Sequence, residues 1–316
     1  MLRVHKIKLN PHQEQDVYFR KACGVARHAY NGALATWKRQ YEAGEKPHEA
    51  SLRKLYTRIK PVEFPWALEV MKCAPQQAIK NAGKAYKDFF DRLKKGEKGL
   101  DVGYPQFKKK GLSDSFRANN GPATKGANAV PTDGKKIKLP IIVWIRLREA
   151  VRFSGTIQST TVSWLADGGY LSILIETQDA LEAKTHSGAV GVDLGPKTFA
   201  TLSTGEFIKG PKAHRSLSKG LRRLNQSRSR KTQGSANFSI AKTKRSKRYK
   251  RIPDIRQDAV HKLSHRLSTE FSVIGIEDLN VKGMARNGNL ARSVGDAGMR
   301  MFRTQVEYKA AMTGSF

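Results

Sequence analysis

The chain has 316 residues, 39% of them apolar, so it is long enough for two or three domains with buried cores. Its 59 lysines and arginines against 27 acidic residues give a formal net charge of +32, which favours a polyanionic partner such as nucleic acid. A membrane-surface protein could share this charge, but the sequence has neither the basic amphipathic helix nor the lipidation motif that such a protein needs.

The N-terminus and the cysteines indicate the compartment. MLRVHKIKLNPHQEQ lacks the long apolar segment of a secretion signal, and no stretch approaches the roughly 18 apolar residues of a membrane-spanning helix. Cys23 and Cys73 lie far apart, which excludes a disulfide framework and a four-cysteine zinc site in this chain. We therefore expect a cytoplasmic protein with no zinc and no membrane partner.

The N-terminal third predicts one strand followed by helices. Residues 2–9 nearly alternate apolar with basic residues and slip once at His5-Lys6, which is typical of a half-exposed strand with a bulge. Apolar residues then recur at threes and fours, which predicts helical hairpins with basic outer faces. The expected helices span about 12–43, 49–59 and 75–95, and the interrupting prolines are Pro61, Pro65 and Pro75.

The pattern changes near Gly96. A turn-rich basic segment, DVGYPQFKKKG, comes first, and short alternating runs follow it, many of them separated by glycine or proline. These runs predict a small antiparallel barrel or sandwich whose first strand is residues 2–9, with the helices inserted between. They read SFRAN, KKIKLP, VWIRL, EAVRFSG, TIQSTTVSWLA and GGYLSILIET, and a linker, TQDALEAKTHSG, follows them.

From Gly188 onward the sequence predicts an α/β domain with a mixed sheet. The strands AVGVDL, KTFATLS and EFIK come first, separated by turns. A long basic helical region and a helix at about 254–271 then precede another strand, SVIGIED. Single carboxylates stand at the ends of the first and last of these strands, Asp193 and Glu277.

Asp193 and Glu277 are the candidate catalytic residues. If their strands run parallel in one sheet, both carboxylates lie at the same edge, where sites of α/β proteins form. Neighbouring carboxylates repel each other unless a cation neutralises them, and oxygen ligands favour Mg²⁺ or Mn²⁺ over zinc. In a protein built for polyanions this predicts metal-dependent phosphodiester hydrolysis. The alternative makes Asp193 a turn or cap residue and Glu277 a surface residue, but the matching strand ends argue against it.

A second candidate site is the basic stretch between Lys209 and Asp254, which contains no acidic residue. A solvated surface helix would carry interspersed acids for i,i+4 pairs, so their absence predicts a surface that follows phosphates. The predicted contacts are Lys219, Arg222, Arg223, Arg228, Arg230, Lys231, Lys242, Lys244, Arg245, Lys247, Arg248, Lys250 and Arg251.

The segment YPQFKKK allows two interpretations. Its aromatic and basic residues suit stacking on unpaired bases or gripping a nucleic-acid backbone. Alternatively, the phenylalanine is anchored in the core beside solvated lysines. The residues concerned are Tyr104, Phe107, Lys108, Lys109 and Lys110.

Several motifs together resemble one protein family. GVDLGPKTFATLSTGE and VIGIEDLNVKGM resemble the first and second RuvC motifs of TnpB (OrfB) proteins, which insertion sequences encode and which are relatives of the type V CRISPR effectors. RMFRTQVEYKA resembles the helix that follows, and LNPHQEQ, ARHAYNGAL and YPQFKKKG resemble N-terminal landmarks of the family. The resemblance covers nearly the whole chain in the right order. It implies a transposon-associated, RNA-guided DNA endonuclease that binds a guide RNA and recognises double-stranded target DNA beside a short motif.

The resemblance also implies an α/β multi-domain fold. An RNase H-like (RuvC) nuclease domain would occupy residues 183–316, incomplete at its C-terminus. A β-barrel wedge domain would occupy 1–10 and 97–182, with a helical recognition domain inserted at 11–96.

The family's residue roles follow from the same match. Asp193 would be the first-strand ligand that bridges both Mg²⁺ or Mn²⁺ ions, and Glu277 the ligand of the second motif. The residues that would lie near the duplex entry are Lys6, Lys8 and Arg27, and the basic stretch would contact guide RNA or heteroduplex.

Two parts of the family pattern are missing from this sequence: the zinc ribbon and a third RuvC motif with another aspartate. We expect Mg²⁺-dependent hydrolysis to be impaired, because a site with two of three carboxylates binds its second ion poorly. Asp278 should face the other side of its strand, and Asp296 matches a linker position, so neither is expected to substitute. Two alternatives remain, a nuclease-deficient RNA-guided DNA-binding repressor and a general RNA-binding protein, and the latter leaves the paired carboxylates unexplained.

Overall fold

The structure is a computed structural model that describes residues 1–97, 102–112, 114–119, 130–142, 144–177, 188–284, 286–288 and 291–315. The chain divides into two compact units, Met1–Asp179 and Ala180–Phe316. The predicted linker, TQDALEAKTHSG, lies almost wholly outside the described residues. In the part of the chain that the structure describes, no helix has the length and apolar character needed to cross a membrane.

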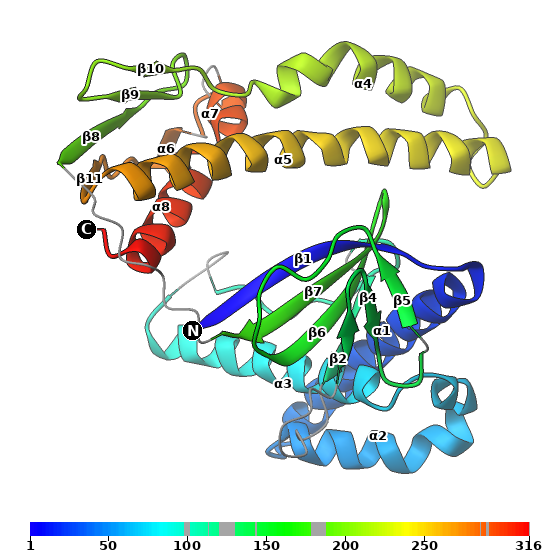
Figure 1. Cartoon of the computed structure of the whole chain (residues 1–316). Coiled ribbons are helices and arrows are strands. Elements are labelled where there is room, and N and C mark those ends of the chain that lie inside the picture. The colour runs from blue at the N-terminus through cyan, green and yellow to red at the C-terminus, as the bar shows by residue number, and fades with distance from the viewer. Residues whose placement is uncertain are drawn as a thin grey trace. The chain divides into compact units, whose positions relative to one another are not determined.

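An antiparallel sheet of seven strands in the order β2-β6-β7-β1-β5-β4-β3 forms the first unit (Figure 1). The N-terminal strand lies at its centre, which confirms that residues 2–9 belong with strands from much later in the chain. Among the described strands the order is linear, and no pairing between β2 and β3 closes a barrel. The strands are β1 (Leu2–Asn10), β2 (Asp114–Asn119), β3 (Thr132–Asp133), β4 (Lys136–Lys138), β5 (Trp144–Leu147), β6 (Thr156–Leu165) and β7 (Gly168–Glu176).

The expected bulge in β1 is wrong. Residues 2–8 pair with β7 in one unbroken register. The strand keeps its alternation through the His5-Lys6 slip by burying His5 in the core, where it is 6% exposed. His5 Nδ1 accepts a hydrogen bond from the Arg152 backbone N–H at 3.2 Å. Burial lowers the pKa of His5 and so favours the neutral ring that this site requires.

The run EAVRFSG was expected to be a strand and is not one. It connects β5 to β6 without joining the sheet. Its last residue, Gly155, has φ +138 and packs so closely on the Glu176 carbonyl that no side chain fits there. Alternation alone did not reveal this conformation, which only glycine adopts readily.

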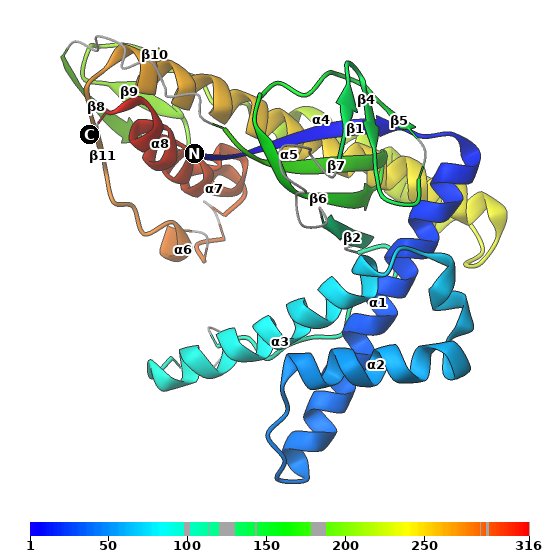
Figure 2. The same cartoon turned by 60° about the horizontal axis from the view of Figure 1, so that its bottom comes forward.

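The helices of the first unit confirm the periodicity, but Pro61 does not interrupt the second of them, which continues to Glu63. They are α1 (Gln13–Glu42), α2 (Glu49–Glu63), the short 3₁₀ helix η1 (Pro65–Glu69) and α3 (Cys73–Lys94). Helices α1 and α3 pack against β2, and α2 lies on their far side from the sheet (Figure 2). Phe19 of α1 stacks on Phe116 of β2 with ring centroids 6.1 Å apart. Pro75 falls in the first turn of α3, where its missing N–H costs little.

The second unit contains the predicted mixed sheet, in the order β10-β9-β8-β11. Strands β8, β9 and β10 are antiparallel, and β11 runs parallel to β8. The strands are β8 (Ala189–Leu194), β9 (Ala200–Leu202), β10 (Phe207–Ile208) and β11 (Val273–Ile276). The helices are α4 (Ala213–Ser229), α5 (Ala236–Glu270), α6 (Val281–Met284), α7 (Ala291–Ala297) and α8 (Met299–Thr313).

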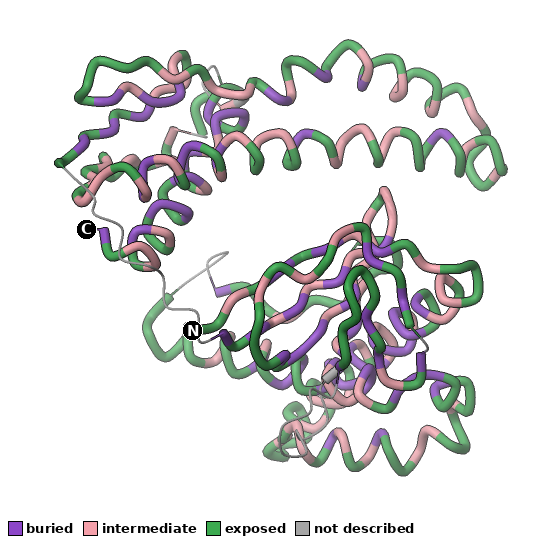
Figure 3. The backbone as a smooth tube through the Cα atoms, in the orientation of Figure 1, coloured by how far each residue is buried: buried purple, intermediate pink, exposed green. Residues whose placement is uncertain are grey.

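The helix expected at 254–271 is the C-terminal part of α5, a single helix of 35 residues that passes through Pro253. Its C-terminal part is fixed by the core, where Val260, Leu263 and Leu267 are buried together with the strands of the sheet. Its N-terminal part lies beside α4, and Figure 3 shows this α4–α5 hairpin as mostly exposed or half-buried. Packing of one end therefore accounts for a helix that a proline would otherwise interrupt.

Helices α5 and α8 provide the apolar cover of one face of the small sheet. Phe302 and Val306 of α8 join the core formed by Val190, Val192 and Leu194 of β8. Because side chains alternate along a strand, the residues between these three lie on the opposite face of the sheet.

Candidate metal and nucleic-acid sites

The two strand-end carboxylates lie level with each other. Asp193 is exposed between the buried Val192 and Leu194, on the face opposite the core. The parallel register pairs Ile276 of β11 with Val192 of β8, so Glu277 follows at the level of Asp193. The two strands therefore run parallel, which is the condition on which the prediction of a shared edge depended.

Asp193 and Glu277 line one open, shallow hollow of about 570 Å³ on β8, β9 and β11. Neither carboxylate has a hydrogen-bond or ion-pair partner among the described residues. Thr201 of β9 and Ser203, directly after this strand, also line the hollow, and no pattern in the sequence marks either residue. Only the β8–β9 register, which pairs Asp193 with Thr201, brings them there.

A tight turn explains why glycine follows Asp193 at a spacing of two. The Gly195 N–H donates to the Phe199 carbonyl at 3.3 Å, which closes the turn into β9. A Cβ at this position would lie 2.9 Å from the Thr198 carbonyl oxygen, closer than side chains tolerate. Gly195 therefore allows β8 to end directly beyond its carboxylate.

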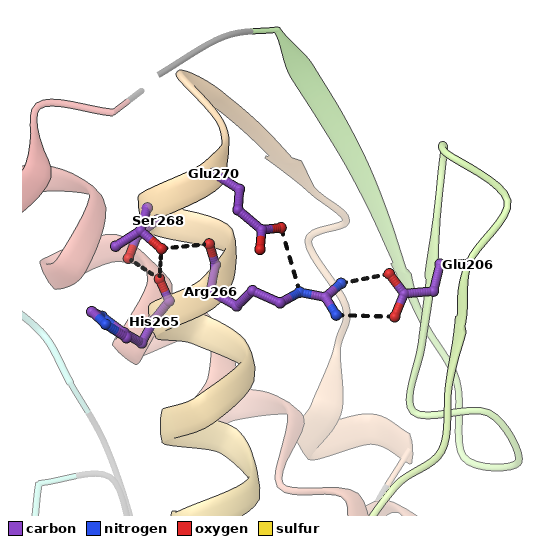
Figure 4. Close-up of polar contacts among 6 residues, drawn as sticks. Glu206, His265, Arg266, Ser268 and Glu270 are labelled. Atoms are coloured by element: carbon purple, nitrogen blue, oxygen red, sulfur yellow. Dashed lines mark hydrogen bonds and ion pairs between the residues drawn. The ribbon is translucent and has the colours of Figure 1, made fainter. Parts of the chain in front are cut away.

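An ion pair fixes the β9–β10 hairpin to α5. Arg266 donates to both carboxylate oxygens of Glu206, at 3.0 and 2.6 Å, and its Nε lies 3.5 Å from Glu270 (Figure 4). The Arg266 guanidinium holds the pKa of the Glu206 carboxyl below its usual range. Figure 4 shows the pair joining the helix to the strand loop, so it helps to hold β9 beside β8.

The other two carboxylates considered in the sequence have partners. Asp278 accepts a hydrogen bond from Arg303 of α8, as expected for a side chain that does not share the face of Glu277. Asp296 is buried and caps the first turn of α4, accepting the backbone N–H groups of His214 and Arg215 at 2.9 and 3.3 Å. Asp278 is thus held in a surface ion pair and Asp296 in a buried helix cap.

The donor set at the sheet edge fits a hard divalent cation in part. Two exposed carboxylates without partners are oxygen ligands of the kind that Mg²⁺ and Mn²⁺ prefer. Among the residues the structure describes, however, no group of three or more His, Cys, Asp or Glu side chains is arranged to hold a metal ion.

The predicted basic contacts divide into exposed and anchored residues along the α4–α5 hairpin. Arg228 lies 6.0 Å from the ring of Phe238, Arg245 donates to Asn225 at 2.5 Å, and Lys250 pairs with Asp254 at 2.7 Å. The first two contacts join α4 to α5 beside a small core, whereas the Lys250–Asp254 pair lies within α5. Lys231 and Arg248 are half-buried, and the exposed members are Lys219, Arg222, Arg223, Arg230, Lys242, Lys244, Lys247 and Arg251.

In the YPQFKKK segment the phenylalanine is exposed, so the interpretation that anchors it in the core is wrong, although a tyrosine and a lysine of the segment are packed. The Tyr104 hydroxyl lies 3.2 Å from that of Tyr86, and Lys108 lies 4.4 Å from the ring centroid of Tyr30. Burial lowers the pKa of Lys108, so this lysine is part of the packing. Phe107, in contrast, is 61% exposed, and Lys109 and Lys110 beside it are exposed as well.

The N-terminal candidates differ in whether an ion pair occupies the side chain. Arg27 forms a half-buried ion pair with Asp114 that ties α1 to β2. Lys8 pairs with Asp167 at 3.0 Å, whereas Lys6 is exposed and lies 5.0 Å from the ring centroid of Tyr170.

Comparison with known proteins now defines the class of this chain. Residues 172–288 match the family model OrfB_IS605, described as "Probable transposase", and residues 1–46 match HTH_OrfB_IS605, described as "Helix-turn-helix domain". In this chain residues 1–46 contain β1 and α1, and α2 begins at Glu49. A Streptomyces pristinaespiralis relative is 32% identical over 326 residues, covering 99% of this chain and 75% of its own. The chain therefore belongs to the OrfB (TnpB) family.

Two relatives and one solved structure show which proteins this chain resembles. The Streptomyces protein is named "Putative RNA-guided DNA endonuclease". A relative from Escherichia coli strain K12 carries the same name with the suffix InsQ, and is 29% identical over 99% of this chain and 79% of its own length. Among solved structures, the Cas12f1–sgRNA–target DNA complex contains a chain with a TM-score of 0.54 at 12% identity, covering 96% of this chain and 72% of that chain. At this identity the likeness concerns the fold alone.

Proposed function

We propose that this chain is an RNA-guided, DNA-binding endonuclease of the TnpB type that acts on DNA in the cytoplasm of a prokaryotic cell. The observation that carries the proposal is the parallel β8–β11 register, which sets Asp193 and Glu277 level on one open face. The relatives named as RNA-guided DNA endonucleases support the same assignment. So does the high positive charge, because guide RNA and target DNA are both polyanions.

Asp193 and Glu277 would hold Mg²⁺ or Mn²⁺ through their carboxylate oxygens. Such ions supply an activated water and charge stabilisation for phosphodiester hydrolysis. The protein's part is to keep both carboxylates unpaired and level. The turn at Gly195 and the Arg266–Glu206 pair support this by fixing the strands on either side. With two carboxylates at the site, we expect the 316-residue chain to cleave slowly.

The domain roles form part of the proposal. Residues 183–316 would be the RuvC nuclease domain, residues 1–10 and 97–182 the wedge domain, and residues 11–96 the recognition domain. The mixed sheet with level carboxylates supports the first, and the insertion of α1–α3 between β1 and the later strands supports the other two. The exposed cations of the α4–α5 hairpin would contact guide RNA or heteroduplex through phosphates.

Cleavage with the chain's own RNA tests the proposal. RNA that copurifies with the protein would be sequenced, and a matching DNA duplex offered with Mg²⁺. We expect guide-dependent DNA binding and slow cleavage that Asp193→Ala and Glu277→Gln abolish, together with weaker Mn²⁺ binding by either variant. The matched control is Asp278→Asn, which alters a neighbouring carboxylate that pairs with Arg303 and should keep the wild-type rate.

The outcomes separate the candidate functions. Guide-dependent binding without any cleavage would favour the nuclease-deficient repressor. Random copurified RNA and no guide-dependent DNA binding would contradict the proposal and favour a general RNA-binding protein.

A further inference from the structure

One solvent-facing surface of the first unit combines aromatic and basic side chains. Its residues come from strands that are distant in the sequence, and only the sheet brings them together. Strands β4, β5, β1 and β7 are neighbours in the sheet, and their registers fix which side chains lie side by side. Lys138 pairs with Trp144, Lys136 with Arg146, and Lys8 with Tyr170. We call this surface the Trp144 face, and its members are Lys8, Lys136, Lys138, Trp144, Arg146 and Tyr170.

Burial shows that the Trp144 face points away from the core. Ile137 and Ile145, which alternate with its members along β4 and β5, are 0% exposed. Lys136, Lys138 and Arg146 are exposed, and Trp144 is 36% exposed. The face is thus the outer side of the sheet, opposite the core residues of the same strands.

The Trp144 face carries more cations than acids. Within the described residues, Lys136, Lys138 and Arg146 have no ion-pair partner. Two acids lie on or beside the face. Asp133 of β3 stands opposite Lys136 in the register without an ion pair, and Asp167 pairs with Lys8 at 3.0 Å and accepts a hydrogen bond from the Tyr170 hydroxyl at 2.6 Å. The cations outnumber these acids and lie in adjacent rows, which favours phosphate groups, because these are repeated anions.

Trp144 adds a preference for unpaired bases. Gln15 of α1 donates to its backbone carbonyl at 3.2 Å, which fixes the start of the strand. Trp144 stands opposite Lys138 in the register and two residues from Arg146, and an exposed indole beside cations can stack on a base while the cations hold its phosphates. In a duplex the base faces are covered by their neighbours, so an indole selects single strands.

The turn that follows β4 is strained. Ile141 adopts φ +69, a left-handed conformation that β-branched residues rarely adopt, and its side chain is 73% exposed. Such strain costs of the order of 1–3 kcal/mol and is concentrated at binding sites. Here the strained residue exposes an apolar side chain three residues before Trp144, in the connection between β4 and β5.

We propose that the Trp144 face binds a single-stranded segment of the guide RNA, with Trp144 stacked on an unpaired base and Lys136, Lys138 and Arg146 on its phosphates. Trp144 and Tyr170 are separated by two strand spacings, about 10 Å, and by about four residues along the strands, roughly 13 Å, which leaves room for more than one nucleotide. The choice of RNA rests on the proposed function, in which the guide is held before the DNA target is met.

Direct binding of oligonucleotides tests the face without any cleavage. The full chain, freed of copurified RNA, would be titrated into labelled oligo(U) of about 16 nucleotides, oligo(dT) of the same length, and a duplex DNA. We expect Trp144→Ala to weaken oligo(U) binding about tenfold or more, and Trp144→Phe to restore most of it. The triple change of Lys136, Lys138 and Arg146 to alanine should reduce the slope of log Kd against log salt concentration by about two.

Matched controls distinguish a loss of binding at the Trp144 face from the effect of removing any exposed charge or aromatic ring, and from misfolding. Phe207→Ala removes another exposed aromatic, and Lys46→Ala with Lys95→Ala removes exposed cations elsewhere, so both should bind oligo(U) like the wild type. Unchanged melting of Trp144→Ala would exclude a folding defect. Wild-type oligo(U) affinity of Trp144→Ala, or a loss confined to DNA, would overturn the proposal. Neither result would bear on the cleavage test of Asp193, so the two proposals fail independently.

Discussion

At the scale of single residues, three aspartates of the second unit have three different surroundings. Asp193 is exposed without a partner, Asp278 pairs with Arg303, and Asp296 is buried against the first turn of α4. The same side chain therefore serves as a ligand candidate, a surface ion pair or a helix cap, and the neighbouring strands and helices determine which.

Asp296→Ala should destabilise the second unit by about 1–3 kcal/mol, because two backbone N–H groups of α4 lose their acceptor. Arg256, 3.7 Å from this carboxylate, also loses an ion-pair partner. Hydrogen exchange of the α4 peptides and urea unfolding followed by circular dichroism would measure the loss.

The control for Asp296 is Asp258→Ala, which breaks an exposed i,i+4 pair with Lys262 on the same unit. Exposed pairs of this kind contribute about 0.3–0.5 kcal/mol. Equal losses in both variants would contradict the capping role.

At the scale of elements, the contact between α5 and α8 contains a half-buried lysine. Lys309 donates to the His261 carbonyl at 2.8 Å and to the Ser264 hydroxyl at 2.7 Å. Gln305 of the same helix accepts from that hydroxyl at 3.1 Å. Burial lowers the pKa of Lys309 to about 8 from its usual 10.5. This polar cluster sets the register of α8, which completes the core beneath the carboxylate edge.

The Lys309 cluster predicts a rise in stability at alkaline pH. Between about pH 8 and 10.5 the unfolded chain keeps the lysine proton that the folded chain has released, so the free energy of unfolding increases with pH. Lys309→Met should remove this rise. Urea unfolding of both proteins at pH 7.5 and 10 measures it, as the difference between wild type and variant.

The control for Lys309 is Lys262→Met, which changes a lysine side chain that is 77% exposed. It should keep the pH dependence of the wild type. A parallel pH dependence in wild type and Lys309→Met would contradict the prediction.

At the scale of the whole molecule, the two units have separate cores. The core of the first unit extends from Ile7 to Ile175, and that of the second from Val190 to Val306. Units with their own cores can unfold independently.

Two thermal transitions are therefore expected for the full chain. All four tryptophans lie in the first unit, so tryptophan fluorescence reports that unit alone, whereas circular dichroism follows both. Asp296→Ala should lower only the transition that fluorescence does not detect. A single transition shifted equally in both signals would contradict this independence.

The sequence by itself determined much of the local structure and which two carboxylates are the candidates for the site. Helical periodicity placed α1, α2 and α3, and strand-end carboxylates selected Asp193 and Glu277, because both signals depend on neighbours along the chain. The charge excess likewise indicated a polyanionic partner without any knowledge of the fold.

Tertiary structure decided what depends on contacts between distant residues. The parallel β8–β11 register made the two carboxylates level, and packing carried α5 through Pro253. Burial of His5 replaced the expected bulge, and sheet registers brought the residues of the Trp144 face together. None of these could be obtained from periodicity, because strand pairing and burial join segments whose spacing along the chain carries no signal of their contact.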